Sequence, residues 1–181
     1  KRRLAYSTVS QLSYIVLGAA LAAPLAAVGG LVHIVHQGLM KVTLFFCAGA
    51  FAETARAEEI AELDGLGRRM PLVSVAFSVA ALGMIGIPPV AGFVTKWYLG
   101  LGGLQAGAPW VLAVLATSAL LNAAYFLPIV YRLWYRGADR PAARLFPPTG
   151  LAAPPAVTAL VALATGALAG AALSPLAWAS L

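Results

Sequence analysis

The sequence predicts an all-helical integral membrane protein with about five transmembrane segments, one of them discontinuous at Pro88-Pro89. Of its 181 residues, 61% are hydrophobic and 10% are charged, and the mean hydropathy is +0.88. Too few polar residues remain to cover the outside of a soluble globule. The apolar residues also come in runs long enough to span a bilayer, separated by stretches with proline, glycine or charge. These observations favour a bundle of membrane-spanning helices.

The charge of the chain indicates a lipid bilayer as its partner. The net charge is +6 and the pI is near 9.9, but the arginines lie at the ends of apolar segments and form no patch with interleaved aromatic residues. Nucleic acid is therefore not an expected partner. The single cysteine, Cys47, excludes an internal disulfide. The chain opens on Lys1 without a methionine or a signal peptide, so we expect it to begin inside a longer protein.

The first expected span covers residues 4–23, and twenty residues suffice for one crossing. Pro24 ends it. Its first half is polar on two adjacent helix faces, so it should face other helices instead of lipid. These groups serve either as hydrogen bonds between helices or as part of a hydrated path. The two faces consist of Tyr6, Ser10 and Ser13, and of Ser7, Gln11 and Tyr14.

The second expected span covers residues 25–52 and carries a lysine deep in the membrane. Along a helix axis, Lys41 lies about 18 Å from Glu53 and about 24 Å from Leu25. This is too deep for the side chain to reach either surface comfortably, so its ammonium group needs a partner or water.

Three polar residues of this span share one helix face. His33, Gln37 and Lys41 recur at every fourth position, and His36 lies one position away from this row. Histidine and a buried lysine both exchange protons at accessible cost, which favours a proton path. The alternatives are histidines packed against backbone carbonyls, or His33 and His36 as ligands of a metal or haem. No further His, Cys or carboxylate completes a ligand set, so we expect no metal.

Residues 71–103 form an expected span that cannot be one straight helix. It would be about 50 Å long, against a hydrocarbon core of about 30 Å. Pro88-Pro89 removes two main-chain donors, and Gly92 loosens the helix further. Such a break survives in lipid only where it faces protein or water. Lys96 just beyond it is typical of a discontinuous transport helix; the alternative is an interfacial anchor formed with the aromatic residues that follow.

The remaining segments complete the bundle. Residues 53–70 are the only long charged connection, predicted as a short surface helix with solvated charges. Residues 110–135 form the next span, kinked by Pro128. We expect a proline-rich linker over residues 141–155 and a final uncharged span over residues 156–173, to which we assign no chemistry.

The distribution of Lys and Arg predicts the orientation. If the broken segment crosses once, the amino end, residues 53–70 and residues 132–144 lie on one side, with ten Lys and Arg, and the opposite loops have none. The positive-inside rule places this side in the cytoplasm. Lys41 and Lys96 remain as the only cations inside the membrane, which favours an ion site at both. The ten are Lys1, Arg2, Arg3, Arg56, Arg68, Arg69, Arg132, Arg136, Arg140 and Arg144.

Three motifs occur along the chain in a characteristic order. They are KRRLAYSTVSQLSY at residues 1–14, HIVHQGLMKVTLFFCAG at residues 33–49 and GMIGIPPVAGFVTKW at residues 83–97. With them, the chain resembles the proton-conducting antiporter subunits shared by multisubunit sodium/proton antiporters and respiratory complex I. It looks most like the D-type subunit of the multisubunit monovalent cation/proton antiporter. The likeness is weakest after Pro141.

The resemblance implies roles for individual residues. Lys41 matches the family's central lysine, His33 the histidine two turns before it, and Lys96 the charged residue of the second discontinuous helix. Many members carry a second histidine four residues before the lysine, where this chain has Gln37. A direct relay from His33 to Lys41 therefore needs His36 or water. Residues 1–140 resemble only the later part of the second of two inverted repeats.

We therefore expect a fragment of a proton-translocating subunit in the cell membrane: a secondary transporter subunit without a cofactor, not an enzyme. Antiport of a monovalent cation, sodium, against protons is the first expectation, with other subunits of a multisubunit assembly as partners. The alternatives are a proton-pumping subunit of a complex I-like or hydrogenase-type redox complex, and a membrane scaffold.

The expected path runs in the middle of the bilayer. Lys41 and Lys96 change protonation state, and His33 passes protons between them and solvent. Water is held by Tyr6, Ser10, Gln37 and Ser13. No acidic residue lies inside any span, so we expect the chain to be inactive without the missing half or its partners.

Overall fold

The computed structural model describes residues 2–137 and 143–170, and all regular structure in these ranges is helical, as predicted. The elements are α1 (Arg2–Ala20), α2 (Pro24–Ala55), the 3-10 helix η1 (Ile60–Leu63), α3 (Leu66–Arg69), α4 (Pro71–Ile85), α5 (Ala91–Gln105), α6 (Trp110–Trp134) and α7 (Thr149–Ala167).

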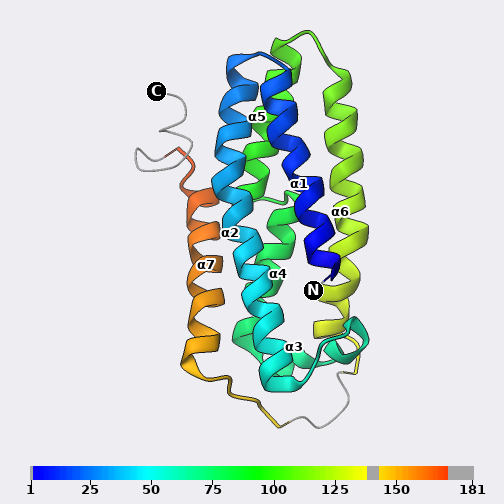
Figure 1. Ribbon diagram of the computed structural model, residues 1–181, viewed down its shortest axis with the longest axis vertical. Coiled ribbons are helices and arrows are strands. Elements are labelled where there is room, and N and C mark those ends of the chain that lie inside the picture. Colours follow the sequence, from blue (N-terminus) through cyan, green and yellow to red (C-terminus); the bar gives the residue numbers. More distant parts are fainter. Residues whose placement is uncertain (1, 138–142, 171–181) are drawn as a thin grey trace.

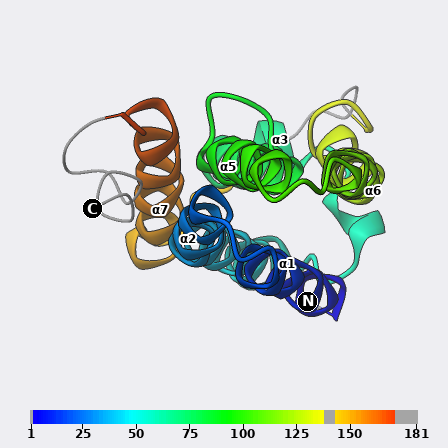
Figure 2. The same cartoon turned by 90° about the horizontal axis from the view of Figure 1, so that it is seen from above.

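The long helices form two layers (Figure 1, Figure 2). One layer contains α7, α2 and α1 side by side, and the other contains α4, α5 and α6. The central element is α2, which contacts α1, α4, α5 and α7. Along the bundle, α4 and α5 follow one another and together take the place of one long helix. The discontinuous segment therefore lies against the middle of α2.

Three helices of the described ranges are long and apolar enough to cross a membrane on their own, namely α2, α6 and α7. The half-helices α4 and α5 have 15 residues each and are too short to do so. They are separated by residues 86–90, which confirms the predicted break at Pro88-Pro89. Several helices that can cross a bilayer, joined in one chain, are the arrangement of a multi-pass membrane protein.

The contact between α1 and α2 determines which face of α1 is buried. A Cβ added to Gly18 would lie 2.9 Å from Cα of Gly30, so the two helices touch backbone to backbone. Pro24 starts α2 at a position where its missing N–H costs no helical hydrogen bond. The buried stripe of α1 consists of Leu4, Ser7, Gln11, Tyr14 and Gly18.

The charged connection forms two short helices, η1 and α3, instead of the single surface helix predicted. A capping box organises η1: the Glu62 carboxylate accepts hydrogen bonds from the N–H groups of Glu58 and Glu59 at 2.7 and 2.9 Å. These bonds favour the ionised carboxylate and hold the pKa of Glu62 below its ordinary value.

The charged connection is bound to the end of α6. Asp64 pairs with Arg132 at 3.1 Å and with Arg136 at 3.3 Å. The N–H of Gly65 donates to the carbonyl of Arg132 at 3.1 Å. Both segments therefore lie at the same end of the bundle, as the charge distribution predicts. Part of the predicted 132–144 region, including Arg140, lies outside the described residues.

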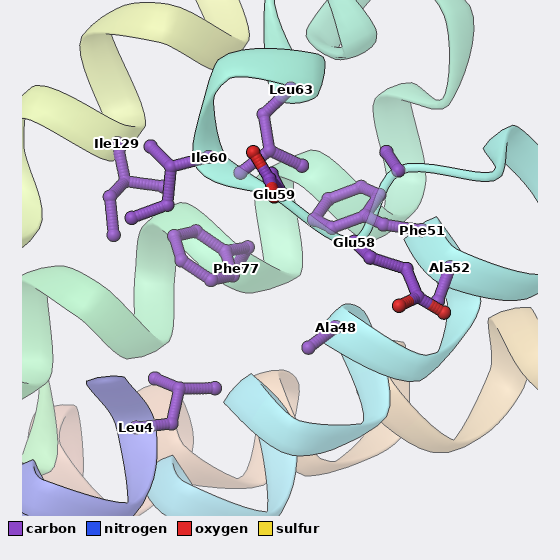
Figure 3. Close-up of a pocket in the computed structure, with 11 residues that line it drawn as sticks. Leu4, Ala48, Phe51, Ala52, Glu58, Glu59, Ile60, Leu63, Phe77 and Ile129 are labelled. Carbon is purple, nitrogen blue, oxygen red and sulfur yellow. The ribbon is translucent and has the colours of Figure 1, made fainter. Parts of the chain in front are cut away.

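An apolar pocket at this end includes the beginning of α1 (Figure 3). Leu4 faces Phe77 and Ile129 there, and the pocket is bounded on the connection side by Ile60 and Leu63. The amino end of α1 thus belongs to the same end of the bundle. Neither Lys41 nor Lys96 lines the pocket, so it is separate from the predicted ion site.

The predicted boundary before the last helix is wrong. We expected a linker over residues 141–155 and a span over residues 156–173, but α7 already begins at Thr149 and contains Pro154 and Pro155. The prolines lie in the second turn, where few main-chain hydrogen bonds precede them, and Thr158 Oγ1 donates to the Pro154 carbonyl at 2.9 Å. The predicted end at residue 173 lies outside the described residues.

Candidate functional site

The side chain of Lys96 folds back from α5 onto the end of α4. Its Nζ donates to the carbonyl of Ile85 at 2.6 Å and to the carbonyl of Met84 at 3.3 Å. It also lies 5.5 Å from the centre of the Tyr14 ring, a cation–π contact. The ammonium group thus lies within the bundle beside the helix break, and these contacts are not those of an interfacial anchor.

Lys96 completes the hydrogen bonding at the end of α4. The last four carbonyls of a helix lack partners within it. Leu82 and Gly83 accept from the N–H of Gly86, each at 3.0 Å, and Leu82 also accepts from Ile87 at 3.1 Å. The carbonyls of Met84 and Ile85 accept hydrogen bonds from the Lys96 ammonium, so all four terminal carbonyls of α4 are bonded. A cation at this end also interacts favourably with the helix dipole.

The unwound segment is compatible with membrane depth because its N–H groups are bonded or absent. Gly86 and Ile87 donate to α4, and Val90 donates to the Ile87 carbonyl at 3.2 Å. Pro88 and Pro89 have no N–H to bond. Gly86 has φ +92, a left-handed conformation that favours glycine, and a Cβ there would lie 2.7 Å from Cδ of Lys96.

Gly92, predicted as part of the break, lies in the first turn of α5. A Cβ at this position would collide with the carbonyl oxygen of Gly83 in α4. Its absence lets the two half-helices touch, so Gly92 brings α4 and α5 together instead of unwinding the chain.

Lys41 is 5% exposed, and its ammonium group contacts the polar stripe of α1. Nζ donates to the Leu4 carbonyl at 3.1 Å and to Ser7 Oγ. Ser7 belongs to the helix face next to the one predicted to hold water, which consists of Tyr6, Ser10 and Ser13. The sequence contains a pattern that predicts the burial of Ser7. Ser7 lies on the same helix face as the apolar Leu4 and as Gly18, and these two residues mark the face that packs.

The two histidines lie between α2 and the start of α5. His36 Nδ1 lies 3.0 Å from the carbonyl of Ala91. A carbonyl only accepts, so Nδ1 is the donor. His33 Nδ1 lies 3.1 Å from Thr95 Oγ1, whose own hydrogen goes to the Gly92 carbonyl. With the Thr95 hydrogen on the Gly92 carbonyl, this ring also donates from Nδ1.

Both imidazoles, when neutral, then present Nε2 as a basic atom. Neither Nε2 has a hydrogen-bond partner within the described residues, although His33 and His36 are fully buried. A buried acceptor without a partner is costly, and a water molecule or a transferred proton would satisfy it. Gln37 is also buried on α2.

The other predicted water-holding residues are not brought to this site. Ser10 and Ser13 are exposed on the outer face of α1, and Tyr6 is 65% exposed. The backbone contact at Gly18 turns the neighbouring stripe inward instead. The prediction therefore selected the wrong one of two adjacent polar faces of α1. The face that packs against the lysines is the one with Ser7, Gln11 and Tyr14.

Within the described residues, the contacts of Lys41 and Lys96 are to uncharged oxygens and one aromatic ring. The Asp64 ion pairs lie at the far end of the bundle. Both lysines can therefore lose a proton without leaving a carboxylate unpaired.

Comparison with known proteins identifies the family of this chain. Residues 1–122 match the family described as NADH:quinone oxidoreductase/Mrp antiporter, transmembrane. The chain is 45% identical over 143 residues to NADH-quinone oxidoreductase subunit N of Desulforudis audaxviator, covering 79% of this chain and 28% of that protein. It is 32% identical over 144 residues to F(420)H(2) dehydrogenase subunit N of Methanosarcina mazei, covering 75% of this chain and 29% of that protein. The chain thus spans less than a third of the length of these curated relatives.

Solved structures share the fold. The Mrp complex of Dietzia sp. DQ12-45-1b matches with a TM-score of 0.82 at 28% identity, covering 98% of this chain and 41% of that one. Respiratory complex I of Thermus thermophilus with bound NADH matches with a TM-score of 0.80 at 26% identity, covering 98% and 38%. The family match covers well over half of the sequence, so this chain belongs to the NADH:quinone oxidoreductase/Mrp antiporter transmembrane family.

Proposed function

We propose that this chain is part of a proton-translocating subunit of a multisubunit membrane complex, in which Lys41 and Lys96 exchange protons inside the bilayer. The observation that carries the proposal is the Lys96 ammonium on the two last carbonyls of α4, beside a helix break. An intramembrane cation held by unwound backbone is the pattern of an ion-transport site.

The cap at the end of α4 is suited to a group that changes its charge. An ammonium has three N–H donors and a neutral amine has two. Two donors are enough for the carbonyls of Met84 and Ile85, so both hydrogen bonds can persist when Lys96 gives up a proton. Only the net charge at the break changes, by one. Lys96 can therefore cycle without unwinding α4 further.

The released proton needs a nearby acceptor, and the unpartnered Nε2 atoms of His33 and His36 are basic and buried. His33 lies beside the Tyr14 ring that also contacts Lys96, with 5.1 Å between the His33 and Tyr14 ring centres. Protonation of one imidazole balances deprotonation of the lysine, and the charge stays inside the site.

Two energy sources for proton translocation are candidates, an ion gradient and a redox reaction. The first corresponds to sodium/proton antiport, which the three sequence motifs imply by resemblance and which is consistent with the Mrp antiporter in the description of the family. The names of the relatives at 45% and 32% identity are those of subunits of redox complexes, which favours a proton pump driven by electron transfer elsewhere in an assembly.

The test uses the full-length parent protein in its assembly, reconstituted in vesicles. Lys96→Ala and Lys41→Ala should each lower proton flux about 100-fold, the order expected for loss of a positioned proton-transfer group. Unchanged flux in both variants would remove the lysines from the mechanism. A sodium gradient that drives proton movement without a redox substrate supports antiport; flux only with the electron donor and quinone supports the redox pump.

A further inference from the structure

The two lysines contact the same helix at different heights. Lys41 Nζ donates to Ser7, and Lys96 Nζ lies over the ring of Tyr14, seven residues further along α1. Seven residues of helix span about 10 Å. This distance is too long for direct proton transfer, so polar groups or water must lie between them.

The buried stripe of α1 is polar over this interval. Gln11 lies between Ser7 and Tyr14 on the same face and is 1% exposed; Tyr14 is 4% exposed. Polar side chains are expensive in a membrane interior unless they are hydrogen-bonded, and they serve either to join helices or to line a hydrated path.

Gln11 and Tyr14 each hydrogen-bond to a polar group of α6. Helix α6 belongs to the layer opposite α1 (Figure 2). Gln11 Nε2 donates to Asn122 Oδ1 at 3.4 Å. Asn122 Nδ2 donates to the Ser118 carbonyl at 2.8 Å, and Tyr14 OH donates to Ser118 Oγ at 2.6 Å. These bonds form one network that begins at Gln11 in the middle of α1, includes Asn122 and Ser118 of α6, and ends at Tyr14. Tyr14 is the residue that contacts Lys96.

We propose that Ser7, Gln11, Tyr14, Ser118 and Asn122, here called the α1–α6 link, carry the proton connection between Lys41 and Lys96. This connection rests on the proposed function, to which it adds the route that protons take between the two lysines. Hydroxyls of Ser7, Ser118 and Tyr14, with water, each take up one proton and release another, so no group of the link changes its charge over a cycle. The amides of Gln11 and Asn122 cannot pass protons in this way; they orient water.

The face of α2 offers a less continuous route. Both histidine rings are held through Nδ1 by Ala91 and Thr95, and Gln37 separates His33 from Lys41. The α1–α6 link instead places a hydroxyl-bearing side chain against each lysine, Ser7 at Lys41 and Tyr14 at Lys96, with the amides between them to orient water.

The decisive variant is the double substitution Gln11→Leu with Asn122→Leu in the full-length complex. Because Gln11 and Asn122 are hydrogen-bonded to each other and both become apolar, neither amide is left buried without its partner. The helices should therefore still pack. Proton flux should fall at least about tenfold, while the amount of assembled complex and its melting temperature stay near the parental values. The matched control is Thr117→Leu on the exposed face of α6, which should leave flux unchanged.

Tyr14→Phe gives a second measurement that does not depend on the double variant folding. It removes the hydroxyl bond to Ser118 and keeps the ring beside Lys96 and His33. Flux should fall, and the ratio of flux in H₂O to flux in D₂O should rise as the interrupted link becomes limiting. Tyr131→Phe, at an exposed tyrosine of α6, should change neither quantity.

Parental flux in an assembled double variant, or in Tyr14→Phe, would overturn the α1–α6 link. If Lys96→Ala and Lys41→Ala abolish flux in the same preparations, the proposed function stands and only the route is wrong. If the lysine variants also retain flux, both the route and the proposed function are wrong.

Discussion

Replacing Lys96 with arginine or methionine separates its two roles at the helix break. Arginine keeps the cation and offers several donors to the carbonyls of Met84 and Ile85, but it does not release its proton near neutral pH. Methionine removes both the charge and the donors. The two variants therefore predict different combinations of stability and proton flux.

The magnitudes follow from the contacts of Lys96. Two hydrogen bonds from a charged donor are worth about 1.5–3 kcal/mol each. Burying the ammonium costs several kcal/mol, which methionine recovers in part, so we expect Lys96→Met to lower the free energy of unfolding by about 1–3 kcal/mol. Lys96→Arg should lose less, because the α4 carbonyls keep donors. Its longer side chain must still fit beside Gly86.

The assay is thermal unfolding of the detergent-solubilised parent complex, paired with proton flux in vesicles. Lys96→Met should lose stability and flux. Lys96→Arg should keep most of the stability and lose flux about 100-fold, because the proton cannot leave. Parental flux in Lys96→Arg would refute the argument that this side chain must change its protonation state.

Three further predictions concern the surroundings of the site. Gly166→Ala should lower the free energy of unfolding by about 1–3 kcal/mol, because a Cβ there would lie 2.5 Å from the carbonyl carbon of Val90 at the break. The control is Gly150→Ala on the open face of α7, which should be neutral or slightly stabilising. Thermal unfolding of both variants checks this, and equal effects would contradict the close contact. Glu62 has a pKa below its ordinary value because it accepts two N–H groups, so its contribution to stability is present above the unfolded pKa and is lost as the pH falls through the folded pKa. Amide exchange at Glu58 and Glu59 should therefore be protected at neutral pH and lose this protection in acid, and Glu62→Ala should abolish the pH dependence. Asp64→Asn should cost only about 0.5–1 kcal/mol, since its pairs with Arg132 and Arg136 are partly exposed; urea unfolding checks this, and a loss above about 2 kcal/mol would show that the pairs act as a buried network.

Length, hydropathy and proline positions were enough to predict most of the helical bundle. The sequence alone predicted the break at Pro88-Pro89 and the end of the bundle that carries the arginines, and it identified Lys41 and Lys96 as cations within apolar segments. These features depend on properties of single residues: a proline has no N–H, and a lysine twelve positions before Glu53 cannot reach water along its own helix. The start of α7 was mistaken because prolines are tolerated in an early helical turn.

The tertiary structure alone decided which partners each lysine has. Tyr6, Ser10 and Ser13 are as polar as Ser7, Gln11 and Tyr14, and adjacent faces of a helix differ by only about 100°. The contact of Gly18 with Gly30 selects the second set. Likewise, the charge of Lys96 was evident from the sequence, but its place on the last carbonyls of α4 depends on two half-helices meeting end to end, because a long flexible side chain bonds whatever the fold brings within reach.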